Sequence, residues 1–261
     1  ELNKSSFIPL LITTDGNPVL EDMEKLSLML SHADAAVLYL LDNRLNARLI
    51  SFFKELSLPC LVISQRPEET EYAIIVKETE GAYSAARHLI ETGRQRIGFI
   101  GGPKDDLMTL DKYLGVLQAL EEEGLVPVSV MHCPSFSPEE AYMAAAKMRE
   151  QCGAENFPDA LFCANDSLSL GGLKYLVEQG YVVPQQVAIV GFDDLPLCRL
   201  SQPELSSVAL PIAPIAYQAA AMLASLEQQG QNGPLASWTS PVVLPTSLVV
   251  RASSRRDEAP S

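Results

Sequence analysis

The chain is poor in the residues that anchor enzymes and metal sites. It has three histidines, at positions 32, 88 and 132, and none lies in a nucleophile motif. His132 and Cys133 are adjacent, but neighbours in a strand point to opposite faces. Gly101-Gly102-Pro103 is followed by no phosphate-binding fingerprint and is interpreted as a turn. The sequence therefore predicts no enzyme, no catalytic residues, no metal site and no cofactor.

Its five cysteines, at positions 60, 133, 152, 163 and 198, are odd in number and lack the spacing of a zinc site or a disulfide framework. Free thiols in apolar runs indicate a reducing compartment. The sequence shows no charged-then-apolar leader and no apolar run long enough to span a bilayer. These features together predict a cytoplasmic protein without a membrane partner.

Basic residues are also few. Lysine and arginine total 19 against 33 acids, which gives a net charge of −14. Such a body repels phosphate backbones, so this chain alone is not expected to bind DNA well. Solubility is a sufficient explanation of the acidic balance.

The pattern that is present is an alternation of short apolar runs and amphipathic segments. Residues 158–194 are its clearest unit: an apolar run at 160–164 ends at Asn165-Asp166, a helical segment ends near Gly180, and a second apolar run at 187–192 ends at Asp193-Asp194. Two strands joined by a helix are expected to be parallel neighbours. Ligands of such sheets collect beyond the carboxyl ends of the strands, where Asn165 and Asp193 lie. The alternative for polar residues there is turn formation or helix capping, which we expect of Asp166.

The same alternation runs through most of the chain. Further strands are expected at 8–13, 35–41, 59–64, 73–76, 97–100, 128–133, 205–210 and 242–250. Helix starts are expected at Asn17-Pro18, at Thr79 as an N-cap, and at a Ser137–Glu140 capping box. A late helix from Pro211 should bury one apolar face, made of Ile212, Ile215, Ala216, Ala219, Met222, Leu223 and Leu226.

The predicted fold class is therefore α/β, with two doubly wound parallel-sheet lobes and a ligand cleft between them. The expected lobes are 1–77 plus 210–243, and 78–209 plus 244–261. Two such lobes make a hinged binder of small ligands.

With these residues in hand, the chain resembles the effector-binding domain of the lactose/galactose-repressor family of bacterial transcription regulators, which has the type I periplasmic-binding-protein-like fold. The segments that carry the resemblance are Gly81-Ala82, Ala86–Ile90, Arg96–Pro103, Gly115, Ala119-Leu120, Asn165-Asp166, Val190–Asp194, Pro203–Val208 and Leu244–Ser253. Their order and spacing together are specific, and the closing Leu-Val-Val-Arg-x-Ser pattern resembles the regulators more than the periplasmic sugar-binding proteins.

The resemblance implies that a small effector, often a sugar or nucleoside, binds between the lobes, and that a homodimer reaches operator DNA through an N-terminal helix-turn-helix absent from this chain. It implies that Asn165 and Asp193 contact the effector and that Phe136 stacks on its apolar face. Lys112 stands where the family usually has arginine, so the planar guanidinium group, which can form two parallel hydrogen bonds, is lost. Ser64 stands where many members have aspartate.

Two further departures follow from the resemblance. Lys77-Glu78 replaces a common Asp-Asn pair. The run Ile8–Thr13 matches the family's second strand, so the first strand and helix of the N-terminal lobe are expected to lie outside this chain. Two alternative hypotheses remain. The first is a transport-type solute-binding protein, which an upstream secretory leader would favour. The second is an enzyme on the same fold, which would need an acid–base pair or a nucleophile with an orienting partner.

Overall fold

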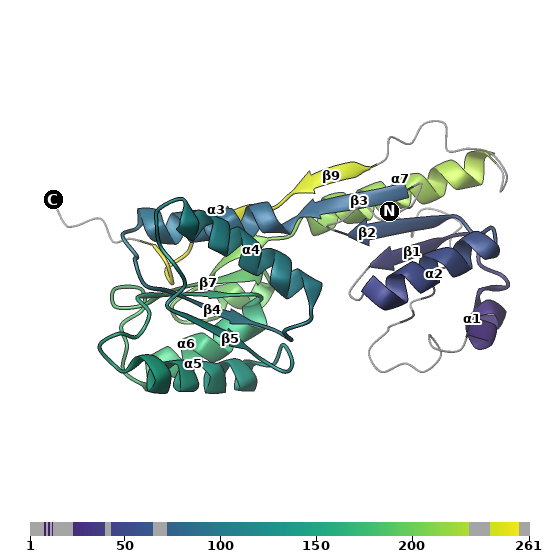
Figure 1. Ribbon diagram of the computed structural model, residues 1–261. Coiled ribbons are helices and arrows are strands. Elements are labelled where there is room, and N and C mark those ends of the chain that lie inside the picture. The colour runs from purple at the N-terminus through teal and green to yellow at the C-terminus, as the bar shows by residue number, and fades with distance from the viewer. Residues whose placement is uncertain are drawn as a thin grey trace. The chain divides into compact units, whose positions relative to one another are not determined.

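The computed structural model describes residues 8, 10, 12, 23–39, 43–64, 72–229 and 241–255. The chain forms two compact units (Figure 1), one made of Glu1–Val76 and Pro211–Leu244, the other of Lys77–Leu210 and Pro245–Ser261. The segments predicted as a strand at 8–13 and as a helix start at Asn17-Pro18 lie largely or wholly outside the described residues.

Unit 1 has a four-stranded sheet in the order β1-β2-β3-β9, in which β1, β2 and β3 run parallel. Leu61, Val62 and Ile63 are buried because β2 lies inside this sheet. The elements of unit 1 are α1 Met23–Leu30, β1 Ala36–Tyr39, α2 Asn43–Glu55, β2 Cys60–Ser64, β3 Tyr72–Lys77, α7 Ile212–Gln229 and β9 Val242–Pro245.

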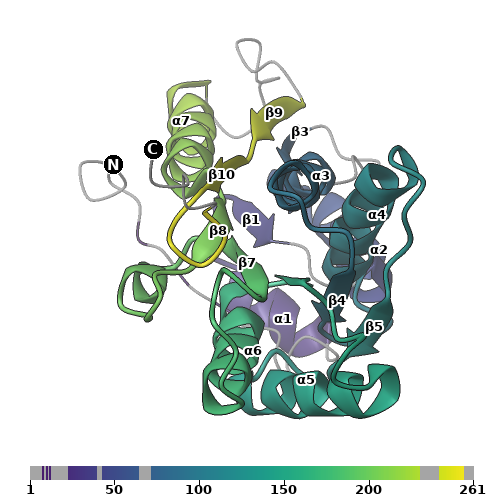
Figure 2. The same cartoon turned by 90° about the vertical axis from the view of Figure 1, so that its left-hand side faces the viewer.

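Unit 2 has a six-stranded sheet in the order β10-β8-β7-β6-β4-β5, parallel except for β10. Figure 2 shows α3 and α4 on one side of this sheet and α5 and α6 on the other. The elements are α3 Glu78–Glu91, β4 Ile97–Gly101, α4 Leu107–Glu121, β5 Ser129–His132, α5 Pro138–Cys152, β6 Ala160–Cys163, α6 Asp166–Glu178, β7 Ala188–Asp193, a 3₁₀ helix Pro196–Arg199, β8 Ser206–Ala209 and β10 Ser247–Val249.

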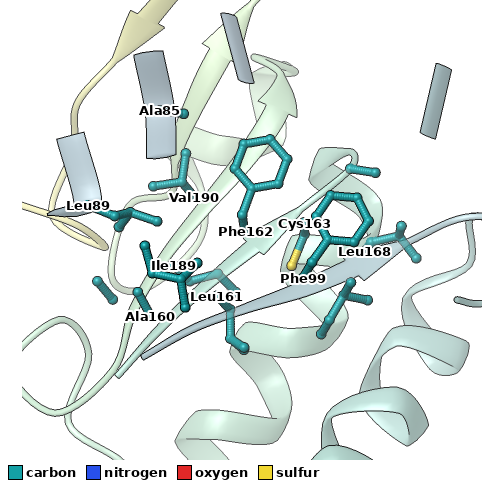
Figure 3. Packing of buried hydrophobic residues seen from close by; sticks show 14 of the residues in the cluster. Ala85, Leu89, Phe99, Ala160, Leu161, Phe162, Cys163, Leu168, Ile189 and Val190 are labelled. Atoms are coloured by element: carbon teal, nitrogen blue, oxygen red, sulfur yellow. The ribbon is translucent and has the colours of Figure 1, made fainter. Parts of the chain in front are cut away.

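The core of unit 2 explains its continuous apolar strands. Helices cover both faces of the sheet, so side chains on both sides of β4, β6 and β7 are buried. This is why the sequences of these strands are continuously apolar. Phe99 and Phe162 stack with ring centroids 5.8 Å apart (Figure 3). Ala85 and Leu89 of α3 cover the same cluster and are fully buried.

One glycine sets how closely α3 and α4 pack. A Cβ at Gly115 of α4 would overlap the carbonyl oxygen of Thr79 in α3, so any other residue would push the helices apart. This contact joins the first turn of α3 to the middle of α4. It also brings the residue one turn before Gly115, Lys112, towards the start of α3.

Two local expectations were wrong. Thr79 does not cap α3, because the helix begins at Glu78, with Lys77 at the cap position and no side-chain cap. The expected apolar face of the late helix is only partly buried: Ile215 and Met222 are buried, but Ile212 is 60% exposed. Ile212 is the first residue of α7, where the helix has not yet reached its packed turns.

Candidate functional site

The carboxyl edge of the unit 2 sheet gathers most of the polar residues that the sequence singled out. β6 and β7 are parallel neighbours, as predicted, with Phe162 opposite Val190. Asn165 follows the end of β6 by two residues, and Asp193 is the last residue of β7. The two polar ends therefore lie on adjacent strands at one edge of the sheet.

Asn165, rather than Asp166, is the N-cap of α6, which corrects the capping role expected of Asp166. The Oδ1 atom of Asn165 accepts a hydrogen bond of 2.8 Å from the backbone N–H of Leu168. This bond uses the side-chain oxygen, so the amide nitrogen of Asn165 still has two donors that could serve a ligand.

Asp166 is instead a fully buried anchor of the loop that follows β7. Its Oδ1 accepts from the Ser207 hydroxyl at 2.6 Å, and its Oδ2 accepts from the Leu195 N–H at 2.7 Å. Ser207 Oγ in turn accepts from the N–H of Asp194 at 3.0 Å. Arg251 completes the network with a 2.6 Å ion pair to Asp194.

This network holds Asp193 in an uncommon conformation. Asp193 and Asp194 have φ values of 102° and 54°, in the region that favours glycine. Such strain persists only where surrounding contacts enforce it, and it concentrates at functional sites. The hydrogen bonds to Asp194 and Leu195 supply that enforcement just beyond Asp193.

The Asp193 carboxylate itself forms no hydrogen bond within the described part of the chain. Burial raises its pKa from the ordinary value to about 7, against the lowering effect of Lys112 and with the help of Asp166 and Glu78. A strained, partly buried carboxylate with free acceptors is suited to bind a ligand hydroxyl or amine.

Lys112 is buried and paired. Its Nζ atom lies 3.2 Å from Oε2 of Glu78 and 4.2 Å from the ring centroid of Phe192. Only 4% and 3% of the Lys112 and Glu78 side chains are exposed. Burial raises the pKa of Glu78, while Lys112 acts in the opposite direction. Glu78 is the main residue of this edge that was not among the effector-binding residues predicted from the sequence. The sequence signal for it was the Lys77-Glu78 pair, which stands where the family commonly has Asp-Asn.

Phe136 and Ser64 differ in how the structure places them. The Phe136 ring, 38% exposed, lies against Gly102, where a Cβ would overlap it. Gly102 follows β4, so the ring stands at the same carboxyl edge as Asn165. Ser64 ends β2 in unit 1, whereas the other four candidates belong to unit 2.

The described residues were also searched for metal sites, membrane-spanning helices and other depressions. No group of three or more acids, histidines or cysteines there has the geometry to hold a metal ion. None of the helices described is both long and apolar enough to cross a membrane. A depression of about 410 Å³ between α5 and α6, lined by Tyr142 and Arg149 among others, lies near the carboxyl ends of these helices and so away from the edge described above.

Comparison with known proteins gives the class. Residues 86–254 match the family model of the periplasmic binding protein-like domain. The chain belongs to this family, and its fold is that of the type I periplasmic-binding-protein-like α/β domains.

The relatives narrow the class. The HTH-type transcriptional repressor PurR of Haemophilus influenzae is 33% identical over 154 residues, which are 58% of this chain and 45% of the repressor. The chain thus matches about half the length of such curated relatives. The transcriptional regulator CelR, solved as a complex with cellobiose, is 27% identical with a TM-score of 0.75, covering 89% of this chain and 70% of CelR. A transcription regulator GntR from Chromobacterium violaceum, 24% identical with a TM-score of 0.80 over 97% of this chain and 90% of its own, shares the fold.

These matches place the chain with the effector-binding domains of the lactose/galactose-repressor family, as the resemblance implied.

Proposed function

We propose that the chain is the ligand-sensing, dimerising core of a DNA-binding transcription regulator that responds to a sugar or another small metabolite. The observation that carries this proposal is the strained Asp193 with free acceptors, at the end of the strand next to the one that Asn165 follows, and close to the charge of the buried Lys112. Polar groups converging on the carboxyl edge of a doubly wound sheet form a small-molecule site. The PurR relatives, which are transcriptional repressors, support a regulatory role, and the CelR–cellobiose complex supports a sugar effector.

Each candidate in unit 2 then has a role. Asp193 and Asn165 bind ligand hydroxyls from two adjacent strand ends, and the exposed Phe136 ring packs on the apolar face of the ligand. Lys112 orients these groups through its charge. The protein catalyses no reaction and works in the cytoplasm as a homodimer. As the family resemblance implies, operator DNA is reached through a helix-turn-helix outside this chain. The net charge of −14 makes direct DNA binding by the chain unfavourable.

The test uses the chain itself. Thermal unfolding is measured against a panel of neutral sugars and nucleosides, and hits are quantified by calorimetry with Asp193→Ala alongside. We expect at least one hit and a loss of its binding of at least about a hundred-fold in the variant, since a hydroxyl would lose a charged partner. Binding that is unchanged in a folded Asp193→Ala protein would remove Asp193 from the site.

Ser84→Ala is a matched control, because Ser84 is an exposed residue of the same unit whose hydroxyl bonds only to its own helix. It should leave ligand binding unchanged.

The transport-protein alternative is tested separately. Export to the periplasm, measured by fractionation of the natural host, would favour a solute-binding protein. Retention with the cytoplasmic markers supports the regulator.

A further inference from the structure

The buried pair of Glu78 and Lys112 carries an inference that rests on the proposed function. Glu78 is the first residue of α3, where the partial positive charge of the helix N-terminus favours a carboxylate. Lys112 lies in α4 with its ammonium over the Phe192 ring, next in sequence to Asp193. The positive charge of Lys112 is therefore already neutralised by Glu78, a residue of the protein itself.

The charge balance around Lys112 is negative. Lys112 lowers the pKa of both Glu78 and Asp193, whereas Asp111 and Asp106 act on Glu78 in the opposite direction. Arg251 adds no free cation here, because it is paired with Asp194 at 2.6 Å. A phosphate or carboxylate brought to Lys112 would meet at least two carboxylates in a site of low dielectric constant.

Glu78 also has an acceptor atom that no hydrogen bond of the protein satisfies. Its Oε2 atom is buried and has no hydrogen bond of good geometry, although Lys112 is 3.2 Å away. Thr109, one turn before Lys112 in α4, also has a buried hydroxyl without a hydrogen-bond partner. Buried polar atoms are normally satisfied, so a purely structural ion pair would be expected to complete these bonds. Both atoms are therefore buried polar groups that the protein itself leaves without a hydrogen bond.

We propose that Glu78 determines the charge class of the effector. By acting as a built-in counter-ion to Lys112, it makes the site select neutral or amine-bearing polyhydroxy molecules and reject those with a phosphate or carboxylate group. Glu78 is thus a specificity-determining residue, and Lys112 acts as a donor and an electrostatic partner and does not bind anions.

The experiment compares the wild-type chain with Glu78→Gln and with the double variant Glu78→Gln/Lys112→Gln, using inorganic phosphate as the probe in calorimetry. The glutamine keeps the shape and removes the counter-charge. We expect phosphate to bind Glu78→Gln at least about ten-fold more tightly than wild type, and we expect the double variant to lose that gain. Phosphate binding by the wild type that depends on Lys112, or no gain in a folded Glu78→Gln protein, would overturn the proposal.

A second measurement needs no variant. The wild type is titrated with matched pairs, ribose and ribose 5-phosphate, and glucose and glucose 6-phosphate. Tighter binding of a phosphorylated member overturns the proposal; at least ten-fold weaker binding supports it. If the wild type binds no neutral ligand in the wider panel, the proposed function fails, while the phosphate titration of Glu78→Gln still reports separately on the role of Glu78.

Discussion

Neutralising either member of the Glu78–Lys112 pair should destabilise unit 2, whereas neutralising both should restore it. At 3.2 Å and an effective dielectric constant of about 20, the two charges attract by about 5 kcal/mol. Removing one of them leaves the other buried and unpaired. We therefore expect Glu78→Gln and Lys112→Met each to lower the free energy of unfolding by about 3–5 kcal/mol.

The double variant is expected to lie near the wild type or above it, because two buried charges no longer need to be desolvated. Lys112→Met also removes the contact with Phe192, so it should be the costlier single change by about 1 kcal/mol. Urea unfolding followed by circular dichroism gives the free energies, and hydrogen exchange of β4 and β7 amides assigns the change to unit 2.

A matched control is present in the same unit. Lys174 and Glu178 form an i,i+4 pair at 2.5 Å, but 64% and 45% of their side chains are exposed. The same substitutions there should have no resolvable effect, because water screens the pair. If the Glu78 and Lys112 variants behave like this control, or if their effects add without coupling, then the buried charges do not depend on each other and the argument is refuted.

Three further predictions concern the other residues of this edge. The pKa of Asp193 is raised to about 7, so this carboxyl stabilises the folded state fully below about pH 4, and the stabilisation, up to about 4 kcal/mol, is lost as pH rises through 7. Urea unfolding from pH 4 to 8 should show the free energy of unfolding falling with pH, and Asp193→Asn should remove this pH dependence. Gly102→Ala should displace the Phe136 ring and weaken ligand binding at least ten-fold in calorimetry while changing the free energy of unfolding by less than about 1 kcal/mol, and an unchanged affinity would separate the ring from the site. Arg251→Met should cost about 3–5 kcal/mol in urea unfolding because Asp194 is left unpaired, and adding Asp194→Asn should recover part of it; a small loss would show that the pair is dispensable.

The parallel order of β6 and β7 could be predicted because it follows from local patterns. A short apolar run, a helix with a glycine after its end and a second apolar run allow few arrangements, and the polar residues Asn165 and Asp193 mark where each strand stops. The fold class of the whole chain follows from repeating this unit.

The pairing of Glu78 with Lys112 could not be predicted in the same way. The two residues lie in different helices, and their contact depends on how closely α3 approaches α4, which Gly115 sets by having no side chain. The misplaced start of α3 has a related cause. Thr79 is a good cap by residue type, but the helix begins two residues earlier than such a cap would place it, directly after β3. Local preference was outweighed by the packing of the strand end.

The closing pattern that contributed to the family resemblance has a physical role in the site. Arg251 donates to the Leu205 carbonyl at 2.7 Å and pairs with Asp194, so it ties the end of β7 to the start of β8. The Ser253 hydroxyl accepts from the Ser206 N–H at 2.8 Å and donates to the Ile189 carbonyl at 2.7 Å. The segment after β10 thus ties β7, which ends at Asp193, to its neighbour β8. Because the strain at Asp193 has to be enforced by its surroundings, a substitution at Arg251 should alter ligand binding even though Arg251 is held by the protein and contacts no ligand.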